Sequence, residues 1–236
     1  MGWNEQDNIN VIDCLLVYFR PINAYTIDNK ANKLMLKKSQ KFYLILKRAI
    51  SIFGATVGLV LLSPVMLLVA LMTKLTSKGP VFFRQTRLGR NEKPFTLLKF
   101  RSMRVDAKQV PPEYMTIEEQ QAMVTPWGKF IRKTSLDELP QLFNILVGDM
   151  SFIGPRPSQD AEHEGDLIRE RKSYYPNAYL VKPGLSGYSQ VYLHRNHNYK
   201  DKAKYDSWYV QHLSFWLDAK IFVWSIVCAL GPDKGR

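Results

Sequence analysis

The sequence predicts an α+β, mainly helical protein that is monotopic, entering a membrane from one side. Its expected parts are a re-entrant helix-break-helix, amphipathic interfacial helices and a small β-hairpin. Three observations predict this class: residues 49–73 contain no charged side chain, both flanks of this run are basic, and two β-rich runs follow it around a polar turn. A helix over residues 49–73 would be roughly 37 Å long, against roughly 30 Å for the hydrocarbon core of a bilayer. The run is therefore long enough to enter a membrane.

The composition limits the class of protein. The chain has 236 residues, a net charge of +12 and 46% hydrophobic residues, which excludes a disordered basic tail. A mean hydropathy of −0.22 excludes a protein with several membrane spans. The two cysteines, Cys14 and Cys228, lie far apart, which favours a reducing compartment and leaves no zinc site. The positive charge predicts an anionic partner: nucleic acid, a phosphorylated small molecule or an acidic membrane surface.

We assign the membrane helix to residues 47–75, after an N-terminal extension, residues 1–46, whose role the sequence does not indicate. At its centre Pro64 cannot donate a backbone hydrogen bond to the carbonyl of Val60, so the helix should break there. The hydroxyl of Ser63 can compensate that carbonyl in lipid. The break is therefore expected at Ser63 and Pro64.

The charges beside this helix bear on its topology. A spanning helix should have asymmetric flanks, whereas basic residues on both sides suit a helix that enters and leaves by one face. The sequence thus favours a re-entrant helix over a true span or a buried core helix. The flanking cations, expected to face lipid headgroups, are Lys37, Lys38, Lys41, Lys47, Arg48, Lys74, Lys78, Arg84, Arg87 and Arg90.

After the membrane helix, the runs at 81–89 and 94–105 read as a β-hairpin joined by the turn Gly89 to Lys93. Residues 105–124 are polar and predict a surface loop with a short helix. Residues 125–148 have helical periodicity on both sides of Ser135.

Two further segments are expected nearer the C-terminus. Residues 181–193 have the glycines and β-branched residues of a turn and a strand. Residues 213–236 should form an amphipathic helix and tail, with Trp216 and Trp224 in the headgroup region. A helix of the protein core fits this C-terminal segment equally well.

The adjacent acids Asp137 and Glu138 are the strongest candidates for chemistry. Neighbouring positions on a helix point about 100° apart, so both carboxylates can border one site. The spacing of Ser135 and Glu138 also fits a capping box, which would explain the acids structurally. The two explanations are compatible.

Three cations stand in segments before and after this pair in the sequence. Lys99 lies in the second β-rich run, Arg132 precedes Asp137, and Arg156 stands between two prolines. Arginine matches phosphate oxygens with two parallel hydrogen bonds, and flanking prolines would hold one guanidinium in place. A solvated basic face is the alternative for each of them.

Four segments, taken in order, closely resemble the bacterial sugar transferase family, whose small monotopic members are phosphoglycosyl transferases. They are KFRSM at 99–103, SLDELPQLFNILVGDMSFIGPRP at 135–157, KPGLSGYSQV at 182–191 and YDSWYVQHLSFWLDAKI at 205–221. The resemblance runs from about residue 47 to residue 230, and it includes the basic-flanked helix interrupted at Ser-Pro.

The resemblance implies a Mg²⁺-dependent enzyme on the cytoplasmic face of a bacterial inner membrane. Such enzymes transfer a sugar-1-phosphate from a UDP-sugar to undecaprenyl phosphate and release UMP, which initiates assembly of a membrane glycan. Residues 76–212 would then be the cytoplasmic catalytic domain. The implied partners are the two substrates and anionic lipids, without nucleic acid, and a homo-oligomer is left open.

The resemblance also implies roles for single residues. Asp137 would be the nucleophile that forms a phosphosugar-aspartyl intermediate, and Glu138 would hold Mg²⁺. The residues expected to contact phosphate or nucleotide are Lys99, Arg132, Pro155 and Arg156. A carboxylate that attacks a diphosphate meets like charge, which explains the need for a divalent cation and fixed cations around it.

The chain departs from the family pattern in its third block. The family usually continues with Trp-Gln-Val and Gly-Arg-Asn, where this chain has Tyr188-Ser189-Gln190-Val191 and then His194-Arg195-Asn196. The departure leaves the identity of the sugar open. A membrane-bound scaffold without catalysis, and a glycosyltransferase that would release UDP instead of UMP, are the competing functions.

Overall fold

The computed structural model describes residues 36–105, 122–193 and 198–230. Within these ranges the chain is mainly helical, as predicted, and it has two small sheets. The loop expected at 105–124 and most of the N-terminal extension fall outside the described residues. The α-helices are α2 (Lys38–Thr76), α4 (Pro126–Lys133), α5 (Gln141–Val147), α6 (Ala161–Ser173), α7 (Tyr188–Tyr192), α8 (Tyr199–Gln211) and α9 (Phe215–Leu230).

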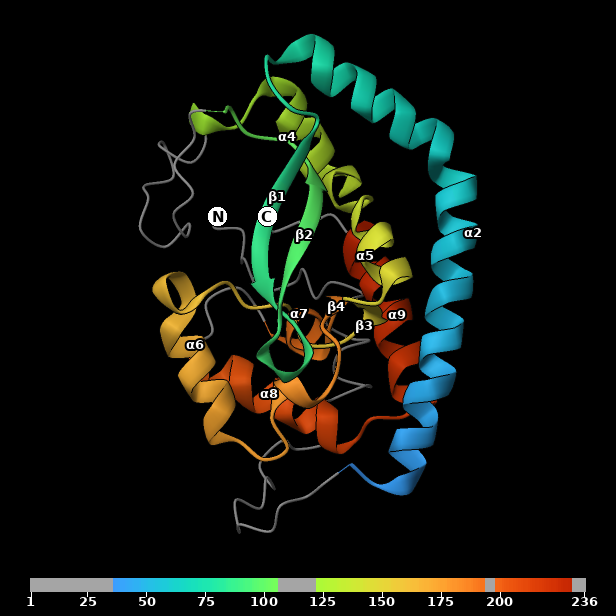
Figure 1. The fold of residues 1–236 in the computed structure, drawn as a ribbon, viewed down its shortest axis with the longest axis vertical. Helices are drawn as coiled ribbons and strands as arrows, with labels where there is room; N and C mark the ends of the chain where they lie inside the picture. The colour runs from blue at the N-terminus through green and yellow to red at the C-terminus, as the bar shows by residue number, and fades with distance from the viewer. Residues whose placement is uncertain (1–35, 106–121, 194–197, 231–236) are drawn as a thin grey trace, which may run out of the picture.

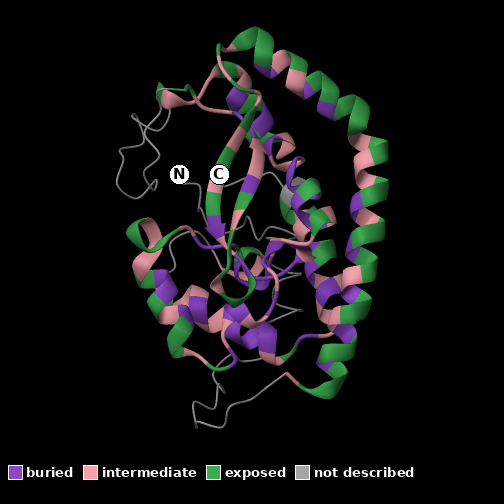
Figure 2. Cartoon of the chain, in the orientation of Figure 1, coloured by how far each residue is buried: buried purple, intermediate pink, exposed green. Residues whose placement is uncertain are grey.

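Helix α2 runs along the whole domain (Figure 1). It begins at Lys38, inside the segment assigned to the N-terminal extension. One face contributes to three hydrophobic clusters in turn, through Tyr43, then Ala55, then Met66 with Val69. Figure 2 shows that its outward face is mostly exposed, and the exposed side chains there are largely apolar. Both ends of α2 therefore pack on the same body.

The predicted break at Pro64 is a bend within a continuous helix. Pro64 lies inside α2, and Figure 1 shows α2 turning in its C-terminal half to arch over α4 and the hairpin. The Ser63 hydroxyl donates to the Val60 carbonyl over 2.8 Å, as the sequence predicted. This bond replaces the one that Pro64 cannot make, so the helix bends without ending.

The hairpin is confirmed. Strands β1 (Phe82–Leu88) and β2 (Pro94–Phe100) pair antiparallel, with Leu88 opposite Pro94. The short 3₁₀ helix η1 (Arg90–Glu92) forms the turn, where Asn91 and Glu92 adopt positive φ. Strand β2 packs on α5, which connects the hairpin to the rest of the domain.

Residues 125–148 form two α-helices with a turn between them. Helix α4 ends at Lys133, the 3₁₀ helix η3 (Leu136–Glu138) follows, and α5 begins at Gln141. The Asn144 side chain accepts a hydrogen bond from the Leu98 amide and donates to the Thr96 carbonyl. Strand β2 and α5 are thereby held in register, and η3 lies at their junction.

A second, parallel sheet was not predicted. Strand β3 (Ser151–Ile153) pairs with β4 (Gly184–Ser186), so two segments far apart in the sequence meet in space. A Cβ at Gly184 would lie 2.1 Å from the Gly154 nitrogen, which no side chain permits. The strand expected within residues 181–193 is present as the short β4, while residues 188–192 wind into helix α7 after Gly187.

Helix α9 has features of both alternatives considered for the C-terminal segment. Ile221 and Trp224 are buried, while Trp216 is 80% exposed and Phe222 and Val223 are exposed beside it. One face therefore belongs to the core and the other is available to a membrane. Trp224 does not face the headgroup region, which corrects that part of the prediction.

Three cations assigned to the membrane flanks are used inside the protein instead. Lys47 is buried and pairs with Asp218 of α9 over 2.6 Å. Arg48 donates to the last carbonyls of α5, those of Ile145 and Leu146. Arg87 is buried in the hairpin. Charge in the sequence could not reveal the partners of Lys47 and Arg48, because they lie far away along the chain. Arg87 donates both to the nearby Gln85 side chain and to the distant Pro157 carbonyl.

Candidate functional site

An open pocket lies where the hairpin, η3, α5 and the loop after β3 converge. It encloses about 280 Å³, open to solvent. Six of the side chains around it are polar or charged: Arg87, Lys99, Glu138, Gln141, Arg156 and Gln190. Gly184 and Leu185 of strand β4 also line the pocket.

Three cations from separate segments line this pocket. Arg87 comes from β1, Lys99 from β2, and Arg156 from the loop that joins β3 to α6. Burial, together with the neighbouring positive charge of Arg156, lowers the pKa of the Arg87 guanidinium to about 10. The cations repel one another across a small space, so the pocket is suited to a polyanionic ligand.

Glu138 brings a negative charge to the same pocket. Its Oε1 lies 3.0 Å from the Nζ of Lys99, and both side chains are about one-fifth exposed. Lys99 and Glu138 are therefore neutralised by each other, and a phosphate that binds Lys99 must compete with this ion pair.

Asp137 lies beside Glu138 on η3 and is buried. It is not among the side chains that line the pocket in the described part of the chain. The capping box expected here is wrong, because Ser135 adopts a left-handed conformation with φ of 60° and makes no side-chain cap hydrogen bond. The Glu138 side chain pairs with Lys99 instead of the helix start.

Arg132 and Pro155 take other positions. Arg132 is exposed in the last turn of α4 and is not a lining residue of the pocket as described. Pro155 is buried, and its carbonyl accepts a hydrogen bond from the Gly184 amide over 3.0 Å. Pro155 thus ties the loop to β4, while Arg156 remains exposed beside the pocket.

Sequence reasoning missed Arg87, Gln141 and Gln190 as lining residues. The alternation of β1 carried a usable signal for Arg87, since Phe83, Gln85 and Arg87 share the less exposed face of this strand. Gln141 and Gln190 had no such signal, because their approach to the pocket depends on the turn at η3 and on helix α7.

The donor set bears on whether Mg²⁺ fits here. No group of three or more His, Cys, Asp or Glu side chains among the described residues is arranged to hold a metal ion. Mg²⁺ usually takes one or two protein carboxylates and completes its shell with water and substrate phosphates. Glu138, with the amide of Gln141 nearby, fits a Mg²⁺ ion that is shared with a bound diphosphate.

Fold and site together define a protein with an exposed apolar helix face and a pocket lined by three cations. The bacterial sugar transferase family model matches residues 42–231, and the chain belongs to this family. The resemblance of the sequence segments to this family is thereby confirmed.

Several curated proteins are similar to the chain. It is 39% identical over 182 residues to a UDP-N-acetylgalactosamine-undecaprenyl-phosphate N-acetylgalactosaminephosphotransferase of Aeromonas hydrophila, covering 76% of this chain and 42% of that protein. It is 41% identical to a UDP-glucose:undecaprenyl-phosphate glucose-1-phosphate transferase of Escherichia coli K12, covering 75% and 38%. An exopolysaccharide production protein of Rhizobium leguminosarum is 36% identical, covering 81% and 98%. The chain thus spans about two-fifths of the first two relatives and nearly all of the third.

Proposed function

We propose that the chain transfers a sugar-1-phosphate from a UDP-sugar to undecaprenyl phosphate and releases UMP, as a first step in the assembly of a polysaccharide or other membrane glycan. The observation that carries this proposal is the convergence of Arg87, Lys99 and Arg156 on a pocket bordered by Glu138, in a member of the sugar transferase family. Similar proteins are named as transferases between these two substrate classes.

The proposed reaction has two displacements at one phosphorus atom. Asp137 is buried next to Glu138 in this structure, so the scheme requires its carboxylate to turn toward the bound ligand. A carboxylate oxygen of Asp137 then attacks the phosphorus that carries the sugar, and the bond from this phosphorus to the bridging oxygen breaks, so UMP leaves. A phosphate oxygen of undecaprenyl phosphate then attacks the same phosphorus and releases the carboxylate of Asp137. The covalent intermediate separates the encounter with a soluble substrate from that with a lipid substrate.

The side chains of the pocket have assigned tasks in this scheme. Arg87 and Arg156 bind the diphosphate, and Lys99 turns from Glu138 toward phosphate when the substrate arrives. Glu138 and Gln141 would hold Mg²⁺, which supplies charge neutralisation on the phosphate oxygens when bound. The attack of one anion on another becomes feasible because these charges are fixed before the reaction begins.

Membrane attachment is proposed to be monotopic, on the cytoplasmic face of the inner membrane. The N-terminal end of α2 is bound through Gln40 to the carbonyls of Val210 and Gln211, and its C-terminal end through Thr73 to Trp127. A helix with both ends fixed to one polar body is unsuited to crossing a bilayer, whereas its exposed apolar face suits insertion from one side.

Identification of the released nucleotide tests the reaction. The full chain, reconstituted with Mg²⁺ and undecaprenyl phosphate, is supplied in turn with different UDP-sugars. We expect UMP in equal amounts to the lipid-linked product. Release of UDP would favour a glycosyltransferase, and no turnover with any UDP-sugar would favour a scaffold.

Intact-mass spectrometry tests the nucleophile. Without undecaprenyl phosphate, the wild-type chain should gain the mass of one phosphosugar, and Asp137→Asn should not. An adduct that persists in Asp137→Asn would reject Asp137. Asp166→Asn, which changes an exposed carboxylate away from the pocket lining, is the control and should keep the adduct.

Labelling of introduced cysteines tests the topology. Single cysteines at Lys41 and Lys78, both exposed beside α2, should react with an impermeant reagent from the same side of the membrane. Reaction from opposite sides would show that α2 spans the bilayer.

A further inference from the structure

Behind the pocket, Arg171 of α6 and Asp206 of α8 form a buried ion pair. Their side chains are 3% and 1% exposed. The guanidinium donates to Asp206 Oδ2 through Nε over 3.0 Å and through Nη2 over 2.5 Å. Neither residue lines the pocket that holds Lys99 and Glu138, and no task in the proposed reaction requires either of them.

The pair reaches the loop that carries Arg156. Arg171 Nη1 donates to the carbonyl of Arg156 over 2.9 Å and to the hydroxyl of Ser158 over 2.5 Å. The neighbouring carbonyls of the loop are also bound: that of Pro157 by Arg87 and that of Ser158 by the Leu88 amide. The backbone carbonyls of Arg156, Pro157 and Ser158 are therefore all held by hydrogen bonds, one from Arg171 and two from strand β1.

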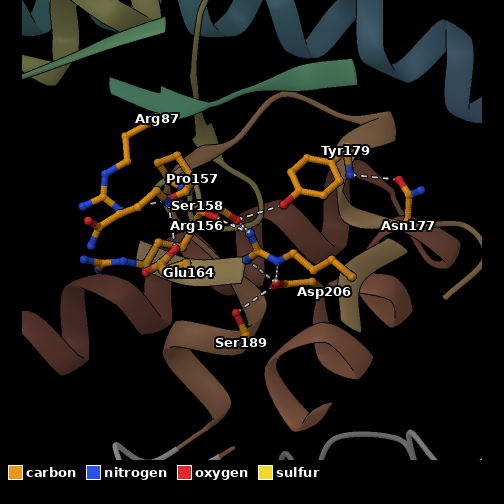
Figure 3. Close-up of polar contacts among 11 residues, drawn as sticks. Arg87, Arg156, Pro157, Ser158, Glu164, Asn177, Tyr179, Ser189 and Asp206 are labelled. Carbon is orange, nitrogen blue, oxygen red and sulfur yellow. Dashed lines mark hydrogen bonds and ion pairs between the residues drawn. The ribbon is translucent and has the colours of Figure 1, made fainter. Parts of the chain in front are cut away.

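The same pair reaches helix α7. Asp206 Oδ1 accepts a hydrogen bond from the hydroxyl of Ser189 over 2.8 Å, and the next residue, Gln190, lines the pocket. Figure 3 shows Ser189 and Asp206 joined below the loop of Arg156, Pro157 and Ser158. One buried ion pair thus holds two segments, far apart in the sequence, that border the same pocket.

We propose that Arg171 and Asp206 are positioning residues that hold Arg156 and Gln190 in place around the ligand. A buried ion pair gives little net stability compared with apolar residues of similar volume, because desolvation offsets its attraction. Its fork of directed hydrogen bonds, however, fixes orientation in a way that apolar packing does not. The kinetic consequence rests on the proposed function; the positioning itself does not.

Hydrogen exchange of the full chain tests the positioning without any substrate. Ser158→Ala removes the hydroxyl that accepts a hydrogen bond from Arg171, and Ser189→Ala removes the hydroxyl that donates to Asp206. Both variants leave the ion pair in place, whereas Arg171→Lys removes the forked guanidinium. We expect Ser189→Ala to speed exchange in residues 188–192 and Arg171→Lys to speed it in residues 156–160. Asp166→Asn is the matched control, since it changes an exposed carboxylate on the same helix as Arg171, and it should leave both segments unchanged. Unchanged exchange in both segments in all three test variants would overturn the proposal.

A double-mutant cycle tests the consequence for the ligand. Arg171→Lys should raise the KM for the UDP-sugar about tenfold when Arg156 is present, because a charged hydrogen-bonding group is misplaced. In the Arg156→Ala background the same change should raise KM by about twofold at most, while the midpoint of thermal unfolding falls equally in both backgrounds. Equal effects on KM in both backgrounds would show that Arg171 does not act through Arg156 and would overturn that part of the proposal. If the wild type turns over no UDP-sugar, the proposed function fails, and the exchange experiment still decides the positioning.

Discussion

Lys99 illustrates how a single side chain in the pocket has two partners that exclude each other. Its ammonium is paired with Glu138 in the absence of substrate, and the proposed reaction requires it at a phosphate. In the proposed reaction the ion pair neutralises Lys99 until a diphosphate arrives, and Glu138 is released when Lys99 turns away. Under this proposal, binding of substrate and exposure of the carboxylate are coupled.

Replacement of Lys99 tests this coupling. Lys99→Met should lower the rate of UMP release by about 10²- to 10³-fold, the usual loss for one group that stabilises transition-state charge. Steady-state kinetics with the UDP-sugar measure the change. Lys93→Met is the control, because Lys93 is an exposed lysine in the turn of the same hairpin, and a comparable loss in that variant would contradict a specific role for Lys99.

Asp218 is a buried carboxylate in the protein core that has several partners at once. Its carboxylate receives the ammonium of Lys47 and the hydroxyls of Tyr43 and Tyr209. Asp218→Leu should lower the free energy of unfolding by about 3–5 kcal/mol, because a buried ammonium is left without its counter-charge. Denaturant or thermal unfolding of the detergent-solubilised chain measures this loss. The double variant Lys47→Met/Asp218→Leu should recover most of it, and failure to recover would mean that the hydroxyl contacts dominate.

Among single residues, the sequence identified the site residues best where they belonged to a recognisable motif. Lys99, Glu138 and Arg156 are brought to one pocket from segments that the sequence singled out separately. Arg87 was assigned to the membrane instead, because a basic residue near an apolar run has the same appearance whether it faces lipid or a ligand. Its guanidinium donates to the Gln85 side chain on the same strand and to the Pro157 carbonyl, seventy positions away.

At the level of elements, local pattern decided what could be predicted. The hairpin has seven-residue strands and an adjacent turn, so its pairing is local and visible. Strands β3 and β4 have three residues each, which is too short for a strand pattern, and each is recognised only through its pairing with the other. The turn at η3 was hidden because helical periodicity continues across it, while Ser135 changes the direction of the backbone through its positive φ.

The bend of α2 belongs to this scale and can be tested directly. Pro64→Ala restores a backbone donor for the Val60 carbonyl, so the helix should straighten and its C-terminal arm should leave α4. Spin labels at Ile45 and Leu75, both exposed on α2, should move apart in pulsed electron spin resonance after the native cysteines are replaced. Ser63→Ala removes only the compensating hydroxyl and should keep the wild-type distance. An unchanged distance in Pro64→Ala would show that packing, and not proline, imposes the bend.

On the scale of the whole molecule, charge and apolar surface are divided between different tasks. The net charge of +12 includes cations committed to the core, such as Lys47 and Arg171, and cations at the pocket. The cations that are exposed, and so are able to contact a membrane surface, include Lys38 and Lys41 near the start of α2. Exposed apolar side chains of α2, α5 and α9 accompany it, among them Phe53, Val147 and Trp216.

This division predicts two separable contributions to membrane binding. Trp216→Glu should weaken flotation with vesicles of neutral and of anionic lipid alike, by at least about tenfold, because it removes a large apolar contact and adds a charge at the interface. Lys38→Glu/Lys41→Glu should weaken only the additional binding to anionic vesicles, by about 1 kcal/mol for each lysine, and that loss should disappear at high salt. Unfolding midpoints serve as the control, since all three side chains are exposed and should leave stability unchanged. If Trp216→Glu affected only anionic vesicles, the apolar face of α9 would not contact the bilayer, and α2 alone would have to provide the apolar attachment.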